Sequence, residues 1–370
     1  MLRIATIGTS PITCDFIDVV TDDPGAAFIG TLSRDAERAQ SFTAEHGGTR
    51  AFTSLDELAA SSEVDAVYIA SPNALHHDQA LSCIAGGKHV IVEKPFCSTA
   101  AEAQEVFDAA GKAGVVALEA IRPLHDPAFH RCEDVLPRLG RIRRANLHIG
   151  SHSSRYDDIL AGRHTNIFDC DMATGALMDM GVYTVEPMVE MFGVPTSIIC
   201  AGALLDAETR ELSHGPIDGA GTILATYDDV LVELHFSKIT HDLAASQIEA
   251  EMATFTIDQI ETPRHASVRH FGKAERSSAK TGHSKEGDGT EELDLPFCQN
   301  TMVYELSDFL NAVENLPAVI DSPDDLWGAM AGSRHPLGHY RDVTLISLSI
   351  MDEARRQMGV RFPADRVDES

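Results

Sequence analysis

Three side chains in the sequence could hold and transfer protons: the Lys94 ammonium, the Asp179 carboxylate and the Tyr183 phenol. Lys94 lies in the run Glu93-Lys94-Pro95, directly after an apolar segment at 89–92 that predicts a strand. A lysine at the carboxyl end of a central parallel strand points into the ligand crevice of the sheet. Asp179 and Tyr183 are four residues apart, so on a helix they share one face. We predict acid–base chemistry for all three residues; an Asp and a Tyr at the edge of a structural helix are the alternative.

A turn that could bind a phosphate follows the first apolar segment, at Gly8-Thr9-Ser10-Pro11-Ile12-Thr13. It keeps only the first glycine of the Gly-x-Gly-x-x-Gly dinucleotide fingerprint. The hydroxyls of Ser10 and Thr13 and the N-terminus of the following helix still offer hydrogen-bond donors to a phosphate. We therefore assign cofactor binding to Gly8, Thr9, Ser10 and Ile12; a plain strand-to-helix turn is the alternative.

Two arginines follow the second apolar segment, which ends at Leu32-Ser33-Arg34. A cofactor with a free ribose 2′-hydroxyl usually meets an Asp or Glu at this place, whereas an arginine suits a 2′-phosphate. Ser33 and Arg34, with Arg38 one helical turn later, therefore predict NADP as the cofactor. Asp35 keeps NAD open, and solvent-exposed arginines without a ligand are the alternative.

Polar residues also follow the third apolar segment, in the run Ser71-Pro72-Asn73-Ala74-Leu75-His76. Like Glu93 and Lys94, they lie where a parallel strand ends, and open α/β sheets bind ligands at that edge. We assign to the cofactor groove Ser71, Asn73, His76, Glu93 and Lys94. The alternative for Asn73 is that it only caps the helix that follows.

The elements that must position these residues alternate between strand and helix. Strand-like apolar segments lie at 2–7, 27–32, 64–70, 89–92 and 115–120, with helical patterns between them. Capping boxes at Ser54–Glu57 and Thr99–Glu102 mark two helix starts. Right-handed crossovers turn this order into a doubly wound parallel sheet of the α/β class. We predict a dinucleotide-binding domain over 1–122.

From residue 123 the pattern changes to strands joined by short turns. The apolar periodicity predicts helices at 176–192, 302–313 and 342–359, the first of them kinked or shortened by Pro187. Strand patterns occupy 142–150, 198–205, 220–227, 230–237, 245–250 and 254–257. Their close spacing predicts an antiparallel meander, and hence an α+β substrate and oligomerisation domain over 123–370. The polar stretch 264–292 predicts strand fragments and an exposed loop.

Composition and charge exclude several classes of function. The 370 residues include 29 basic and 57 acidic side chains, a net charge of −28 that opposes nucleic-acid and anionic-membrane binding. No apolar run approaches the roughly 20 residues that span a bilayer. The N-terminus lacks a signal-peptide pattern, so we expect a cytoplasmic protein. The seven cysteines show no CxxC spacing and fit reduced thiols.

Two histidine pairs have a spacing that could hold a metal ion on a helix, His148/His152 and His335/His339. Neither pair has a cysteine or carboxylate at ligand spacing in the sequence, and 148–152 lies in a strand-like run. We therefore expect no metal site.

Together these motifs resemble the glucose–fructose oxidoreductase / inositol dehydrogenase / rhizopine-catabolism (Gfo/Idh/MocA) family. The resemblance covers nearly the whole chain and also includes Glu119-Ala120, the run 175–183 and the ending 354–363. It implies an N-terminal Rossmann domain and a C-terminal domain with a large, mainly antiparallel sheet, assembled as a homodimer or homotetramer. It implies hydride transfer between NAD or NADP and a carbinol or carbonyl of a sugar, cyclitol or dihydrodiol-like substrate.

The resemblance also implies roles for individual residues. The lysine of the Glu-Lys-Pro motif, Lys94, lies at the nicotinamide and the substrate. Tyr183 stands where many members have His, as in the trans-dihydrodiol dehydrogenase branch. We expect Lys94 to polarise the substrate oxygen and to lower the pKa of Tyr183, which transfers the proton, while Asp179 orients Lys94 or the substrate. The residues that we place at the substrate are Arg122, Arg155 and Tyr156.

Two other classes of function stay open on the sequence. A dinucleotide-binding sensor without turnover would share the fold, and so would an inert scaffold oligomer. Lys94, Asp179 and Tyr183 together argue against both, because a protein that only binds a dinucleotide needs none of them.

Overall fold

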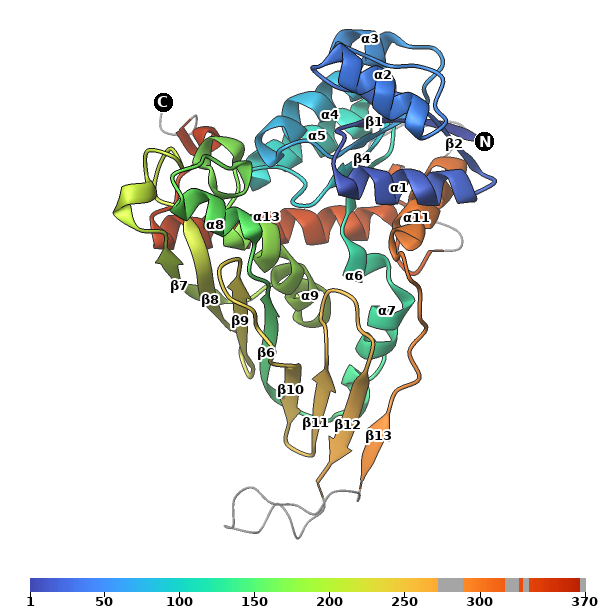
Figure 1. Cartoon of the computed structure of the whole chain (residues 1–370). Coiled ribbons are helices and arrows are strands. Elements are labelled where there is room, and N and C mark those ends of the chain that lie inside the picture. The colour runs from blue at the N-terminus through green and yellow to red at the C-terminus, as the bar shows by residue number, and fades with distance from the viewer. Residues whose placement is uncertain (272–288, 317–325, 329–332, 367–370) are drawn as a thin grey trace.

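Two sheets, one above the other in Figure 1, organise the chain. The computed structural model describes residues 1–271, 289–316, 326–328 and 333–366. The middle of the predicted exposed loop, 272–288, lies outside the described residues.

The first sheet is parallel, as the alternating pattern predicts. Its strands are β1 (Leu2–Ile7), β2 (Ala26–Leu32), β3 (Ala66–Ile69), β4 (His89–Glu93) and β5 (Ala117–Ala120). They lie in the order β2-β1-β3-β4-β5, and each neighbouring pair runs parallel. The chain leaves β1 toward β2 and later returns to β3 on the other side of β1. That reversal opens a crevice at the carboxyl ends of β1 and β3, where such sheets bind ligands.

Five helices accompany this sheet. They are α1 (Pro11–Asp22), α2 (Ala36–Glu45), α3 (Leu55–Ala60), α4 (His76–Ala85) and α5 (Ala100–Ala113). In both predicted capping boxes the hydrogen bond to the N-cap side chain is confirmed. The Ser54 side chain accepts from the Glu57 N–H, and the Thr99 side chain accepts from the Glu102 N–H. All residues of β3 and β5 are buried, which explains why these strands are apolar except for Glu119 in β5.

The second sheet is mixed and has eight strands in the part of the chain that the structure describes. They are β6 (Ile142–Gly150), β7 (Ser197–Leu204), β8 (Asp218–Thr226), β9 (Leu231–Ser237), β10 (Ser246–Ala250), β11 (Ala253–Ile257), β12 (Ala266–His270) and β13 (Thr290–Glu292). Their order is β13-β12-β11-β10-β6-β9-β8-β7. The prediction of a mainly antiparallel sheet is confirmed, although the strands do not form a simple meander, because β6 and β9 pair in parallel. The first strand of the domain inserts between β10 and β9, which turn lengths cannot reveal.

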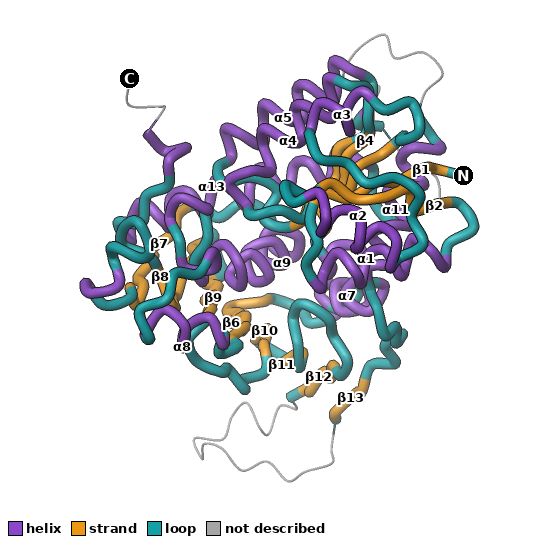
Figure 2. Tube along the Cα trace, turned by 45° about the horizontal axis from the view of Figure 1, so that its top comes forward, coloured by secondary structure: helices purple, strands orange, loops and turns teal. Residues whose placement is uncertain are grey.

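Helices cover one face of the second sheet. The remaining helices are α6 (Arg122–His125), α7 (Pro127–Glu133), α8 (Ser154–Leu160), α9 (Val182–Phe192), α11 (Met302–Glu314) and α13 (Leu337–Met358). Figure 2 shows α9 alongside β6 and β9, on which it packs, and α13 packs on α9 and β7. Side chains alternate along the strands, so Leu147 and Leu234 face this core while His148 and His235 stack on the opposite face.

The two C-terminal helices return to the first sheet. α11 packs on α1, and α13 packs on α5 and β5. In Figure 1, α13 crosses the middle of the molecule between the two sheets. Both cores therefore include residues from the end of the chain, and a domain boundary at residue 122 stays a prediction. Among the described residues no helix combines the length and the apolar character needed to cross a membrane.

Candidate functional site

A π-helical turn, Leu177–Gly181, leads into α9 and carries Asp179. The sequence predicts one continuous α-helix at 176–192, but its first turn is a π-helix. Such π-helical turns are often found at functional sites. The N–H of Leu177 donates to the Asp218 carboxylate over 2.6 Å, which holds the start of the turn. Pro187 does not end the helix, which continues to Phe192.

Lys94 lies directly after β4 and reaches across to this turn. Its Nζ donates to the Asp179 carbonyl oxygen over 2.7 Å and to Asp179 Oδ1 over 2.9 Å. The Lys94 side chain is only 13% exposed. Burial disfavours its ammonium, but Asp179 and Tyr183 outweigh that effect and hold the pKa of Lys94 above its ordinary value. Lys94 is therefore a fixed positive charge that joins the two halves of the molecule.

Lys238, directly after β9, is a second lysine at this carboxylate. Its Nζ contacts Asp179 Oδ2 and lies 3.8 Å from Met180 Sδ. Burial alone would raise the pKa of Asp179, but the two ammonium groups hold it well below its usual range. The sequence reading missed Lys238. Lys238 follows a predicted strand, and this position could have indicated a site residue. It does so only once β9 is known to run parallel to β6, because the carboxyl ends of the two strands then lie at the same edge of the sheet.

Tyr183 projects from the first turn of α9 toward the same lysine. The Lys94 Nζ lies 4.7 Å from the centroid of the Tyr183 ring. Burial raises the pKa of Tyr183 to about 12, and the opposing effect of Lys94 is smaller. The expected net lowering of the Tyr183 pKa was therefore wrong, because the loss of solvent outweighs the neighbouring charge. The structure brings Lys94, Asp179 and Tyr183 together, as the sequence predicts, with Tyr183 as a neutral phenol.

Glu93 and Arg122 lie beside this group. The Glu93 carboxylate accepts the Tyr68 hydroxyl proton over 2.6 Å, and burial raises its pKa. Burial opposes the charge of Arg122, but Tyr183, Glu305 and Glu93 together hold its pKa above the ordinary value. Arg122 also lines a cavity of about 640 Å³ between α1 and the segment 298–303. Glu93 thus fixes the end of β4, and Arg122 lies within electrostatic reach of Tyr183.

Arg155 and Tyr156, the other two residues predicted at the substrate, lie on α8. Arg155 is exposed and pairs with Asp158 over 3.4 Å. Tyr156 is half-buried, with its ring 6.0 Å from that of Phe168 and 5.8 Å from that of His152. No hydrogen bond, ion pair or ring contact joins either residue to Lys94, Asp179 or Tyr183 within the described ranges, so their substrate role stays a prediction.

The turn after β1 requires its glycine. Gly8 has a φ of +119°, and a Cβ at this position would lie 2.6 Å from the Ala70 carbonyl oxygen. Ser10 precedes α1 without a side-chain cap bond, and its hydroxyl lies 3.2 Å from that of Thr13. Ile12, in the first turn of α1, is half-buried against the core. The backbone can therefore approach a ligand closely here, and the first N–H groups of α1 receive no side-chain cap from Ser10.

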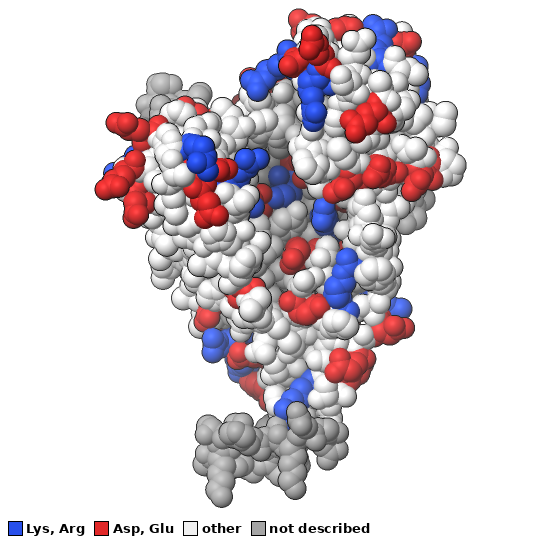
Figure 3. Space-filling model, viewed as in Figure 1, with Lys and Arg blue, Asp and Glu red and all other residues white. Residues whose placement is uncertain are grey.

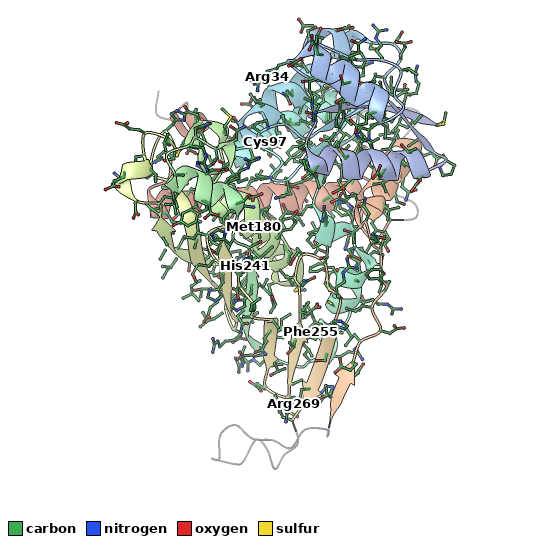
Figure 4. The ribbon with its side chains drawn as sticks, in the orientation of Figure 1. Arg34, Cys97, Met180, His241, Phe255 and Arg269 are labelled. Carbon is green, nitrogen blue, oxygen red and sulfur yellow. The ribbon has the colours of Figure 1, made fainter. Side chains whose placement is uncertain are left out.

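Two arginines lie after the end of β2, Arg34 in the loop and Arg38 on α2. Arg38 donates to the Thr9 hydroxyl over 3.3 Å and to the Thr9 carbonyl over 3.1 Å, so it holds the glycine turn. Asp35 caps α2 by accepting from the Arg38 N–H, and the Ser33 hydroxyl accepts from the Asp35 N–H. Arg34 is exposed and makes no hydrogen bond or ion pair with any residue that the structure describes; Figure 4 labels it on the first domain.

The loop after β3 is tied to its surroundings. The Asn73 amide donates to the Ala173 carbonyl of the second domain over 2.8 Å, and Asn73 is not the helix cap that was the alternative to cofactor binding. Ser71 donates to Gln79 over 2.7 Å. The buried His76 ring lies 2.9 Å from the Ser71 carbonyl and 3.1 Å from the Pro95 carbonyl. His76 thus lies between the loops after β3 and β4, with a carbonyl oxygen facing each of its ring nitrogens.

These features fit a dinucleotide. Gly8 allows close approach of the backbone, α1 offers its N-terminus to a phosphate, and Arg34 is an exposed cation just after β2. Figure 3 shows this face of the molecule hollowed between the first domain and the second, with basic side chains in the hollow. In Figure 4 Met180, the neighbour of Asp179, lies in the second domain below the labelled Arg34.

Comparison with known proteins agrees with this geometry. Residues 2–120 match the model of the GFO_IDH_MocA oxidoreductase family with an NAD-binding Rossmann fold. The chain is 35% identical to scyllo-inositol 2-dehydrogenase (NADP(+)) IolU of Bacillus subtilis (strain 168), over 99% of this chain and 100% of that protein. It is 31% identical to the trans-1,2-dihydrobenzene-1,2-diol dehydrogenase of Mus musculus, over 55% of this chain and 60% of that protein.

Among solved structures, KijD10, a 3-ketoreductase from Actinomadura kijaniata, superposes with a TM-score of 0.76 over 96% of this chain and 98% of that chain. At 21% identity this likeness concerns the fold alone. The Rossmann sheet, the glycine turn and the lysine after β4, together with a relative that matches from end to end, lead to one conclusion: the chain belongs to the Gfo/Idh/MocA family of oxidoreductases.

Proposed function

We propose that this protein is an NADP-dependent oxidoreductase that interconverts a carbinol and a carbonyl on a cyclitol, sugar or dihydrodiol-like ring. The observation that carries the proposal is the pair of hydrogen bonds from Lys94 to Asp179. They set an ammonium from the cofactor-binding domain against the carboxylate and phenol of the second domain. A protein that only bound a dinucleotide would have no use for this arrangement.

The substrate class is supported by relatives. The relative that matches along its whole length is named for scyllo-inositol and NADP, and the mammalian relative is named for a cyclic dihydrodiol. Both compounds are six-membered carbocycles with neighbouring hydroxyl groups. We therefore propose a ring with vicinal hydroxyls as the substrate.

Lys94 supplies the positive charge for the reacting oxygen. An ammonium has three donors, and two of them are used on Asp179. The third can donate to a substrate oxygen and stabilise the negative charge that develops there. Because Asp179 keeps Lys94 protonated, this donor is present over the whole physiological pH range.

Tyr183 supplies the proton in the direction of reduction. With a pKa raised to about 12, it carries its proton under ordinary conditions and is a poor base. When a carbonyl is reduced, the Tyr183 hydroxyl gives its proton to the new alkoxide, and the resulting phenolate is stabilised by Lys94. Oxidation runs the same path in reverse. The nicotinamide, when bound, donates or accepts the hydride.

The test is a screen of cyclitols, sugars and dihydrodiols with NADP and with NAD, in which the absorbance of the reduced cofactor is followed. The Lys94→Ala variant is the background control. We expect turnover with at least one vicinal diol and loss of that turnover in the variant. Tight binding of a cofactor with no turnover on the whole panel in either direction would instead support a non-catalytic sensor.

A further inference from the structure

A second group of chemically active side chains lies where α9 ends and α13 begins. Glu190, on the last turns of α9, faces His335 and His339. The four-residue spacing of the histidines supplies only two ligands, and the nearest carboxylate in the sequence, that of Asp342, pairs with Arg341. The fold brings another carboxylate from a position far away in the chain. We call Glu190, His335 and His339 the Glu190 cluster.

The geometry of the Glu190 cluster is that of a ligand set. The Nε2 of His339 lies 2.7 Å from Glu190 Oε2, and the Nε2 of His335 lies 3.3 Å from Glu190 Oε1. One ligand atom from each of the three residues lies within 4.8 Å of the other two. Ligand atoms around a tetrahedral zinc ion, each about 2.0–2.1 Å from the metal, are roughly 3.3 Å apart. The three side chains need only small movements to reach that spacing.

His335 makes this arrangement unusual. Its Nε2 is buried and makes no hydrogen bond to any described residue, although it lies close to a carboxylate oxygen. A ring nitrogen buried without a hydrogen bond costs free energy. The two imidazole rings stack with centroids 4.0 Å apart and an interplanar angle of 16°. Stacking directs both Nε2 atoms to the same side, toward Glu190.

A second carboxyl group lies beside that of Glu190. The carboxyl of Glu133, at the end of α7, lies in contact with that of Glu190 and is 9% exposed. Its Oε2 makes no hydrogen bond within the described residues, but it lies 3.5 Å from the Arg334 guanidinium, which also pairs with Asp134. The nearly buried carboxyl groups of Glu133 and Glu190 thus lie together, and a cation bound between them would balance their negative charge.

A second histidine–carboxylate group differs in this respect. His164 and His214 both bond to the buried Asp169, each over 2.7 Å, and each imidazole there has its partner. The hydrogen bonds of that group stabilise the loop around 164–174 without a metal ion. In the Glu190 cluster, by contrast, the Nε2 of His335 makes no hydrogen bond to any described residue. We therefore choose the Glu190 cluster, and not the Asp169 group, as the candidate metal site.

We propose that the Glu190 cluster binds a divalent transition metal, with zinc as the best fit to two imidazoles and carboxylates. The ligands are His335, His339 and Glu190, with Glu133 as the fourth. The ion joins the ends of α7, α9 and α13. It lies about two helical turns along α9 from Tyr183, so it fixes the helix that carries the proton donor without touching the substrate.

The experiment uses tag-free protein treated with a chelator and then titrated with Zn²⁺ by calorimetry and with Co²⁺ by absorption spectroscopy. We expect one ion per chain, with the intense visible bands of tetrahedral Co²⁺, and a zinc-dependent rise in melting temperature. His335→Ala, His339→Ala and Glu190→Gln should each weaken binding at least about tenfold. The matched control, His164→Ala in the other histidine group, should leave affinity and stoichiometry unchanged.

The proposal is overturned if wild-type protein binds less than one ion per chain at micromolar concentrations, or if His335→Ala and His339→Ala bind as tightly as wild type. It is also overturned if His164→Ala abolishes binding. Should a cluster variant fail to fold, the Co²⁺ spectrum of wild-type protein still decides, because octahedral bands or none contradict a site of two imidazoles and two carboxylates.

Discussion

The Lys94 ammonium lies over the face of the Tyr183 ring, 4.7 Å from the ring centroid, while its hydrogen bonds go to Asp179. The lysine therefore acts on the tyrosine through the ring and not through a hydrogen bond to the hydroxyl. An ammonium in this position stabilises a phenolate after the proton has left, but it does not remove the proton beforehand.

Tyr183→Phe should lower turnover by about 10²–10⁴-fold, the usual contribution of a general acid. Cofactor affinity should stay within about twofold of wild type, because the ring and its contact with Lys94 remain. Steady-state kinetics with parallel cofactor titration measure both. Near-wild-type turnover of the variant would move the proton path away from Tyr183.

Since the Tyr183 pKa is about 12, turnover of the wild-type enzyme should show no loss from tyrosine ionisation below about pH 10.

The two lysines on Asp179 should differ in importance. Lys94→Met removes the donor to the substrate and should lose at least as much turnover as Tyr183→Phe. Lys238→Met leaves Lys94 in place and should cost turnover much less, roughly tenfold, by loosening Asp179. The Lys94→Met/Tyr183→Phe double variant should be little worse than either single one, since members of one catalytic unit are not additive. Equal losses for Lys94→Met and Lys238→Met would show that both lysines reach the substrate.

Arg34→Ala should weaken NADP binding by roughly 10- to 150-fold, which corresponds to the about 1.5–3 kcal/mol of a charge-assisted hydrogen bond. NAD binding is the internal control and should change little, because NAD lacks the 2′-phosphate. Titration of both cofactors into both proteins gives the four dissociation constants. If wild-type protein binds NAD as tightly as NADP, the preference for the phosphate is refuted.

Glu119 and Glu186 form a buried acid pair that should make stability depend on pH. Burial raises the pKa of Glu119 to about 7, and burial and then Glu119 raise that of Glu186 well above its usual value of 4.5. The folded protein thus keeps a proton that the unfolded chain releases. Stability is full below about pH 4.5 and falls as pH rises through the folded pKa values, by up to about 1.4 kcal/mol per pH unit for one proton.

Glu186→Gln removes this linkage while keeping the shape of the side chain. Melting temperatures at pH 5 and pH 8 should show a smaller decrease for the variant than for wild type. Glu57→Gln, at an exposed helix start, is the control and should follow wild type. Parallel pH dependence of wild type and Glu186→Gln would mean that the pair is ionised in the folded protein.

The homo-oligomer stays a prediction that light scattering can decide. The face of the second sheet that lies opposite α9 and α13 carries exposed Ile199 and Leu231, but His148 and His235 make much of it polar. We expect a mass of two or four times 40.0 kDa, with this face as the contact. A single species of 40.0 kDa across micromolar concentrations contradicts it.

The sequence predicts the fold more completely than the site. Each strand of the first sheet ends within three residues of its expected position, because these buried parallel strands are mainly apolar and are bounded by glycine, proline and polar residues. The sequence does not predict the parallel pairing of β6 with β9, because these two strands are more than 80 residues apart in the chain.

At the candidate site, the motifs predict which residues lie together but not their energetics. Lys94 and Tyr183 lie close together, as the motifs predict, yet the sign of the Tyr183 pKa shift depends on how deeply the ring is buried. Lys238 and the π-helical turn at Asp179 have no local sequence signal. Asn73 looked like a helix cap, but its amide reaches Ala173, a hundred residues away.

The helix α13 makes the two sheets a single cooperative unit. Its Leu348 is buried in the core of the first domain, and its Thr344 donates to Glu119 on β5, while the same helix packs on β7 of the second sheet. Neither sheet can unfold without exposing apolar surface of the other. A substitution that loosens the second sheet should therefore also destabilise the first sheet, including the Gly8 turn after β1, far from the altered residue.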